Sequence, residues 1–174
     1  LMALQKIIVP VTDPENFSFE ECLRFLGRSD KECLHYICNG KIQRMLLSEG
    51  EPVVVEIAPG KAADYLEATV LAPLDEEIAE APIIKYITHW LHLDANLQSF
   101  YDYTAKDPLL KGMAEKYRGL RLVGMPDLFE AISWPVIGQQ INLSFAYTLR
   151  QRFITHFGYH APVNGVDFYL YPHP

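Results

Sequence analysis

Residues 32–47 carry the sequence Glu-Cys-Leu-His-Tyr-Ile-Cys-Asn-Gly-Lys-Ile-Gln-Arg-Met-Leu-Leu, in which Asn39-Gly40 separates two apolar runs. Asn-Gly between such runs is the strongest short-range signal for a β-hairpin. Further β-like runs follow at 52–58 and 65–71, although the last also fits a short helix. The first half of the chain is therefore expected to form a curled antiparallel sheet.

A short helix is predicted just before this hairpin. Ser18 and Glu21 have the spacing of a capping box, with Ser18 as N-cap and Glu21 at the third helical position, and Gly27 lies where the helix would end. A helix on an antiparallel sheet gives an α+β fold for the N-terminal unit, which we place at residues 1–84.

From residue 75 onward the apolar spacing becomes helical, with residues recurring at intervals of three and four. Each predicted segment begins at a residue suited to N-capping. These caps are Asp75, Asp94, Asp107, Asp127 (with Glu130) and Asn142. We expect an all-helical second unit over residues 85–174, incomplete at its C-terminus, because the aromatic, proline-rich tail from Asp167 offers no closing element of its own.

Length and composition limit the compartment and the class of protein. The 174 residues contain no apolar run of about 18, which excludes a membrane-spanning helix. The first ten residues lack the pattern of a secretory signal. Three cysteines without metal-type spacing favour a reducing compartment, so a cytoplasmic location is expected and no membrane partner.

Charge is distributed unevenly. The formal net charge is −7, and the acidic excess lies in the first 95 residues, whereas the rest is close to neutral. A negative total argues against a nucleic-acid binder, and any hypothesis of DNA binding has to account for it.

Few residue constellations suggest chemistry. His89 and His92 have i, i+3 spacing on a predicted helix, but nothing is placed to complete a metal site, so we predict no metal and no cofactor. Glycine-rich phosphate loops and nucleophile motifs are absent from the sequence. The unusual stretch is 134–144, where Gln139 and Gln140 follow Gly138 at a corner between two helices. Two adjacent long amides have no local structural purpose there, and contact with base edges or insertion into a base stack would use them.

Residues 85–174 resemble the DNA-3-methyladenine glycosylase II family of the helix-hairpin-helix superfamily. The resemblance rests on a series of motifs in fixed order. These are Trp90-Leu-His-Leu-Asp94, Asp107-Pro108-Leu109, Tyr117-Arg-Gly-Leu-Arg121, Pro126-Asp-Leu-Phe-Glu-Ala131, Ile137-Gly-Gln-Gln-Ile-Asn142 and the terminal Phe168-x-x-x-Pro172-x-Pro174. Residues 1–84 match more loosely the family's N-terminal α+β domain, which is similar to half of a TATA-binding protein. The expected fold is therefore that domain followed by the leading helices of the family's all-α domain.

The resemblance implies base-excision repair, a form of DNA repair. The family extracts an alkylated purine from double-stranded DNA and hydrolyses its N-glycosidic bond, with a carboxylate stabilising the sugar cation. By this resemblance Gln140 fills the gap left by the flipped base, and Gln139 lines the base pocket. Phe25 resembles a pocket-lining aromatic residue of the N-terminal domain, with Leu23 as its rival and core packing as the structural alternative.

The sequence departs from the family in two respects. It contains no Gly-x-Gly hairpin to hold a phosphate, and the catalytic aspartate that follows that hairpin is missing, so no catalytic residue is assigned. Pro135 also replaces an ordinary helix-forming residue. We expect a piece of a glycosylase that is inactive alone and self-associates through uncovered apolar positions. The alternative is a non-catalytic α+β module that binds a protein or a small ligand.

Overall fold

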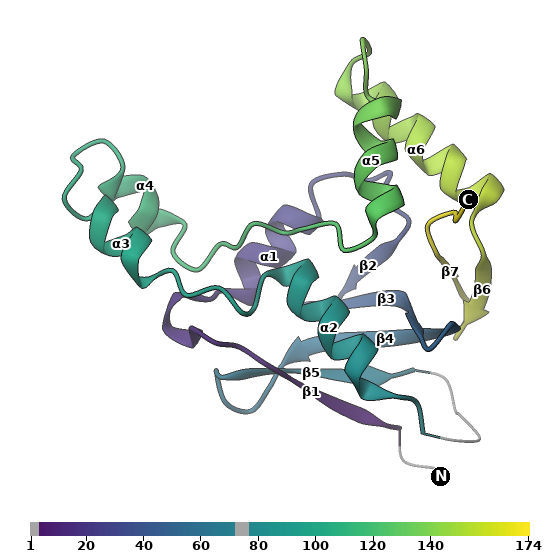
Figure 1. Ribbon diagram of the computed structural model, residues 1–174, viewed down its shortest axis with the longest axis horizontal. Coiled ribbons are helices and arrows are strands. Elements are labelled where there is room, and N and C mark those ends of the chain that lie inside the picture. Colours follow the sequence, from purple (N-terminus) through teal and green to yellow (C-terminus); the bar gives the residue numbers. More distant parts are fainter. Residues whose placement is uncertain (1–3, 72–76) are drawn as a thin grey trace.

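The computed structural model describes residues 4–71 and 77–174 (Figure 1). The strands and helices follow one another in this order: β1 (Lys6–Pro10), the 3-10 helix η1 (Pro14–Asn16), α1 (Phe19–Leu26), β2 (His35–Cys38), β3 (Lys41–Ser48), β4 (Glu51–Pro59), β5 (Tyr65–Val70), α2 (Glu80–Leu91), α3 (Gln98–Thr104), α4 (Lys111–Lys116), α5 (Leu128–Ile137), α6 (Leu143–Phe157), β6 (His160–Val163) and β7 (Val166–Tyr169). The predicted cap at Asp75 lies outside the described residues.

The predicted α+β fold is confirmed. β1 to β5 form one antiparallel sheet in the order β1-β5-β4-β3-β2. β2 and β3 form the expected hairpin, with Ile37 opposite Ile42 and the turn at Asn39-Gly40. Residues 65–70 form a strand rather than a helix, because they pair with both β1 and β4. The edge strand β1 was not predicted, although its alternating burial places Ile7 and Val9 in the core.

Helices α1 and α2 cover one face of the sheet. Their buried side chains include Cys22 and Leu26 from α1 and Ile83, Ile87 and Trp90 from α2, which join the apolar residues of the strands in the main core. The predicted unit boundary after residue 84 falls inside α2, which packs against β1 and β3. The sheet and this helix are therefore one packed body.

Three predicted helix caps form as expected. The Ser18 hydroxyl accepts from the Glu21 amide at 3.2 Å, and the Asp127 carboxylate accepts from the Glu130 amide at 2.7 Å. The Asn142 side chain accepts from the amide of the third helical residue of α6 at 2.9 Å.

Two other predicted helix starts differ from the structure. Asp94 does not cap α3, because Asn96 accepts the hydrogen bond from the first helical residue, Gln98, at 2.9 Å. Asp107 accepts from Leu109 and the next amide, but in a turn just before α4 begins at Lys111. Both errors move a helix start by a few residues along the chain.

The expectation that the second unit is all helical and that its tail has no element of its own is wrong. β6 and β7 form a hairpin around Asn164-Gly165, both with positive φ. Phe168 is buried with Met45 and Val54, on the face of the sheet opposite the main core. Phe168 thus covers a sheet face that the prediction had left open, while Tyr171 packs with Cys33, Leu34 and Ile154.

The motif Tyr117-Arg-Gly-Leu-Arg121 has a structural explanation. Gly119 has φ +87, and a Cβ there would lie 2.5 Å from the backbone nitrogen of Ser18, so a larger residue does not fit. Arg121 donates to the backbone oxygens of Ala95 at 2.7 Å and Asp13 at 3.1 Å. The motif fastens the segment after α4 to the start of α1.

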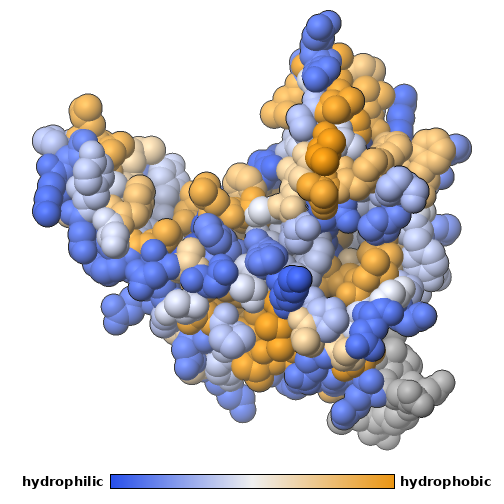
Figure 2. Space-filling view, viewed as in Figure 1, coloured by the Kyte–Doolittle hydropathy of each residue, from blue (hydrophilic) through white to orange (hydrophobic). Residues whose placement is uncertain are grey.

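Helices α5 and α6 stand beside the sheet as a separate lobe (Figure 1). Leu128, Ile132 and Val136 form a stripe along α5 and are 57–73% exposed. Figure 2 shows apolar surface gathered over this lobe. None of the helices in the described residues is long and apolar enough to cross a membrane.

Candidate functional site

A hollow of about 140 Å³ lies where the α5/α6 lobe meets the sheet and its helices. Each neighbouring element contributes side chains to its wall. The aromatic ones are Phe25 of α1, Trp90 of α2, Trp134 of α5 and Tyr147 of α6, and the charged or titratable ones are Arg28, Glu32, His35, Arg44, Glu130 and Arg150. The hollow therefore forms only when the two parts of the molecule come together.

The aromatic side chains form two groups on opposite sides of the hollow. Trp134 and Tyr147 of the helical lobe have ring centroids 5.1 Å apart. On the sheet side, the ring centroids of Trp90 and His35 lie 5.6 Å apart. The buried guanidinium of Arg44 lies 4.5 Å from the Trp90 ring centroid. Such electron-rich faces suit a flat ligand, and a positively charged one above all.

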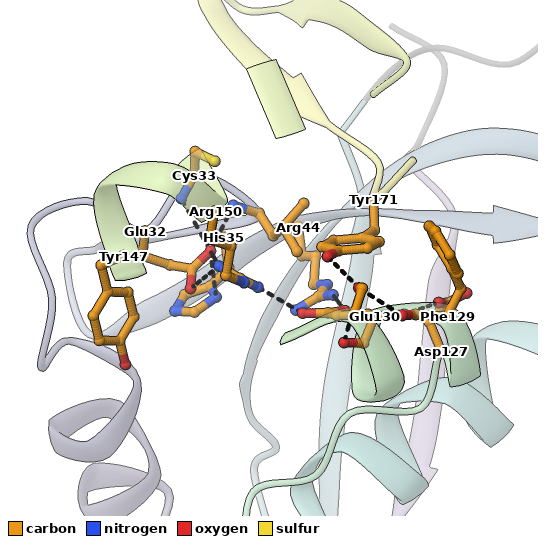
Figure 3. Close-up of polar contacts among 12 residues, drawn as sticks. Glu32, Cys33, His35, Arg44, Asp127, Phe129, Glu130, Tyr147, Arg150 and Tyr171 are labelled. Atoms are coloured by element: carbon orange, nitrogen blue, oxygen red, sulfur yellow. Dashed lines mark hydrogen bonds and ion pairs between the residues drawn. The ribbon is translucent and has the colours of Figure 1, made fainter. Parts of the chain in front are cut away.

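Charged side chains in the wall of the hollow form a buried network (Figure 3). Arg150 of α6 donates to Glu32 at 3.0 and 3.2 Å and to Glu130 of α5 at 2.6 Å. The second carboxylate oxygen of Glu130 lies 3.6 Å from Arg44 of β3. Because Glu32 belongs to the loop before β2, this network joins α5 and α6 to the sheet domain.

The network keeps both of these carboxylates occupied. Burial alone would raise the pKa of Glu32, but Arg150, His35, Arg44 and the hydrogen bond from the Leu34 amide together outweigh it and hold that pKa below its ordinary value. Burial would likewise lower the pKa of Arg150, but Glu32 and Glu130 together raise it. Neither carboxylate is free to act on a ligand while these ion pairs persist.

His35 is neutral at pH 7. Burial, with Arg44 and Arg150 nearby, lowers its pKa to about 4 despite the opposing effect of Glu32. Nε2 lies 3.2 Å from the Leu26 carbonyl oxygen, to which a neutral ring donates its proton. Nδ1 is then an acceptor, and it has no hydrogen-bond partner among the residues that the structure describes.

Phe25 and Leu23 are distinguished by the structure. Leu23 packs against the main core of the sheet. Phe25 is 37% exposed and lines the hollow. The geometry thus places Phe25, rather than its rival, at a candidate pocket, although its role in binding remains a prediction.

The two glutamines lie at the exposed corner between α5 and α6. Gln140 has φ +58, in the left-handed region that a residue with a Cβ adopts at a cost. Gln139 is also exposed and does not belong to the wall of the hollow. Both therefore face away from the core, and their roles in DNA contact and pocket lining remain predictions.

Several residues of the site had no signal in the sequence. Arg150, Glu32 and Glu130 meet from positions far apart in the chain, so no local spacing marks them. Glu130 was assigned to a capping box, and its side chain instead binds Arg150. Within residues 4–71 and 77–174, no group of three or more potential ligands could hold a metal ion.

Comparison with known proteins is consistent with this architecture. Residues 12–132 match the family described as 8-oxoguanine DNA glycosylase, N-terminal domain. A DNA-3-methyladenine glycosylase of Bacillus subtilis is 38% identical over 167 residues, which are 95% of this chain and 55% of that protein.

Solved structures share the fold. A 3-methyladenine DNA-glycosylase from Archaeoglobus fulgidus has a TM-score of 0.74 at 20% identity, covering 97% of this chain and 55% of the other. An 8-oxoguanine glycosylase/lyase from Clostridium acetobutylicum in its apo form has a TM-score of 0.64 at 17% identity, covering 98% and 54%.

The fold is that of the N-terminal part of a DNA glycosylase. The chain belongs to the family of the 8-oxoguanine DNA glycosylase N-terminal domain, and the resemblance to DNA-3-methyladenine glycosylases is confirmed. It spans about half the length of the curated relative and of the solved structures.

Proposed function

We propose that this protein acts in base-excision repair by drawing an alkylated, positively charged purine out of double-stranded DNA. The observation that carries the proposal is the aromatic hollow, whose wall includes Trp134 and Tyr147 of the two helices that the Gln140 corner joins.

The flipped base enters between the aromatic faces of Trp134 and Tyr147 on one side and Phe25 on the other. A purine alkylated at a ring nitrogen carries positive charge, which strengthens its attraction to these faces. Meanwhile Gln140 enters the DNA stack and replaces the extracted base.

The negative net charge of the chain disfavours DNA binding, but basic side chains gather at one place beside α6. Arg28 and Lys31 lie beside the N-terminal residues Leu143 and Ser144 of α6 in an open hollow that also contains Asp30. A helix N-terminus attracts anions. We assign the DNA backbone to this side of the lobe, where two basic side chains and the helix dipole oppose a single acid.

The carboxylate that stabilises the sugar cation is not assigned to the described residues. Glu32 and Glu130 are ion-paired to Arg150, and Asp127 caps α5. We therefore propose that the 174-residue chain binds damaged duplex and does not release the base by itself.

The test compares binding of two duplexes to this chain by fluorescence anisotropy. One duplex contains an abasic-site analogue, which leaves a gap in the stack, and the other is undamaged. We expect tighter binding of the gapped duplex, affinity that falls steeply with added salt, and no base release from methylated DNA. Equal binding of the two duplexes, or none, would favour the protein- or ligand-binding alternative.

A further inference from the structure

Arg28 crosses the mouth of the aromatic hollow. Its guanidinium carbon lies 3.8 Å from the centroid of the Phe25 ring. Its Nε donates to the Tyr147 hydroxyl at 3.0 Å, and one terminal nitrogen donates to the Phe25 carbonyl oxygen at 3.1 Å. One exposed side chain from the end of α1 therefore reaches across to α6.

The same side chain lies between two hollows. Arg28, Ser29 and Tyr147 line both the aromatic hollow and the more open hollow beside Leu143 and Ser144. A ligand that approaches from the side of the α6 N-terminus meets the guanidinium before it meets the ring of Phe25.

Arg28 differs from the other two arginines of the hollow. Arg44 and Arg150 are buried and held by carboxylates. In the part of the chain that the structure describes, the ion pairs do not include Arg28. It is held by a ring face and two neutral oxygens, and water can replace such contacts at small cost in an exposed position.

A guanidinium and an N-alkylated purine share the features that matter at an aromatic face. Both are flat, delocalised cations, and both gain from stacking on an electron-rich ring. The place that Arg28 occupies on Phe25 is therefore a place where such a base would bind, and the two cannot occupy it together.

We propose that Arg28 is an internal competitor at the mouth of the hollow, which occupies the stacking position on Phe25 and is displaced by a planar cationic purine. The inference rests on the proposed function, since it assigns the hollow to a base. Displacement makes Arg28 a specificity-determining residue. Stacking of a neutral purine on the Phe25 ring is weaker than the guanidinium stacking that it would replace. Stacking of a cationic purine matches that of the guanidinium, so only the cationic purine displaces Arg28.

Fluorescence of the chain tests this directly, because both of its tryptophans, Trp90 and Trp134, line the hollow. The probe is 7-methylguanosine in its cationic form, and guanosine is the neutral control. We expect the cationic nucleoside to quench the emission saturably and guanosine to have little effect.

Variants separate competition from direct binding. Arg28→Ala is expected to tighten binding of 7-methylguanosine about fivefold, because one exposed cation–π contact no longer competes. Arg24→Ala is the matched control: Arg24 is exposed on α1, four residues before Arg28, pairs with Glu21 and lies outside the hollow. Phe25→Leu should weaken binding and abolish the gain from Arg28→Ala.

Unchanged or weaker binding by Arg28→Ala would overturn the proposal, as would equal quenching by guanosine and 7-methylguanosine in the unaltered chain. These outcomes concern a free nucleoside. They are independent of the duplex-binding experiment, so failure of the competition and failure of the proposed function can be told apart.

Discussion

The sheet half and the α5/α6 lobe are held together by different forces. The sheet, α1 and α2 enclose a continuous core of aliphatic side chains. The lobe leaves much of α5 exposed, and its contact with the sheet side includes the charged residues Glu130 and Arg150, which are as buried as many core residues. Apolar burial thus fixes the first part, whereas the part that carries the glutamine corner is held by charge pairing together with a smaller apolar cluster of Cys33, Leu34, Ile154 and Tyr171.

Loss of Arg150 gives the largest expected effect. Arg150→Met removes the arginine partner of Glu32 and leaves Glu130 with Arg44 alone. This should cost about 4 kcal/mol of unfolding free energy, in the range for a broken buried ion pair. Hydrogen exchange should show α5 and α6 losing protection while β3 and β4 keep theirs.

Arg152→Met is the matched control, because Arg152 lies two residues along the same helix and is exposed. Adding Glu32→Gln and Glu130→Gln to Arg150→Met should recover part of the lost stability by removing the unpaired charges. Equal melting of the two arginine variants would show that the network does not hold the lobe.

Acid is the second way to separate the two parts. The pKa of His35 is about 4 in the folded protein and 6.5 ordinarily, so the unfolded chain binds the proton first as pH falls. The contribution of His35 to the free energy of unfolding should therefore be complete above pH 6.5 and decline by roughly 3 kcal/mol between pH 6.5 and 4. Below pH 4 this contribution should not change further. The lowered pKa of Glu32 adds a further loss below its ordinary value of 4.5.

Urea unfolding across this pH range provides the measurement. His35→Gln removes the titrating ring and should flatten the decline between pH 6.5 and 4. His89→Gln, an exposed histidine of α2, should leave the decline in place. A decline that survives His35→Gln would assign the acid sensitivity to other groups.

The exposed stripe of α5 predicts a smaller effect, on association. Leu128, Ile132 and Val136 should bring copies of this chain together as concentration rises. Ile132→Glu should shift the sedimentation profile toward monomer, whereas the surface control Lys85→Glu on α2 should not. A concentration-independent monomer before any substitution would contradict this prediction.

Local sequence signals determined how much could be foreseen. Asn39-Gly40 and the Ser18 cap act through their own backbone, and both predictions were confirmed. The second Asn-Gly pair, at 164–165, carried the same signal and was missed, because the helical spacing before it was extended to the end of the chain.

Most of the candidate site could not be predicted from local sequence signals. Phe25 was found through a family resemblance, and structure placed it at the hollow. Arg150 and Glu32 are 118 residues apart and meet only through tertiary packing. No local period or motif encodes such a pair, and the left-handed backbone of Gln140 is likewise visible only in the fold.

The most direct measurement of the central claim is the duplex affinity of variants at the α5/α6 corner. Gln140→Ala and Gln140→Gly both remove the side-chain amide. The glycine variant also relieves the strain of the left-handed backbone, so its free energy of unfolding should rise by up to about 1 kcal/mol. Both variants should bind the gapped duplex about fivefold more weakly than the unaltered chain, the loss expected for about 1 kcal/mol of contact, with undamaged duplex little changed. Unaltered affinity for the gapped duplex in both variants would show that Gln140 only shapes the corner.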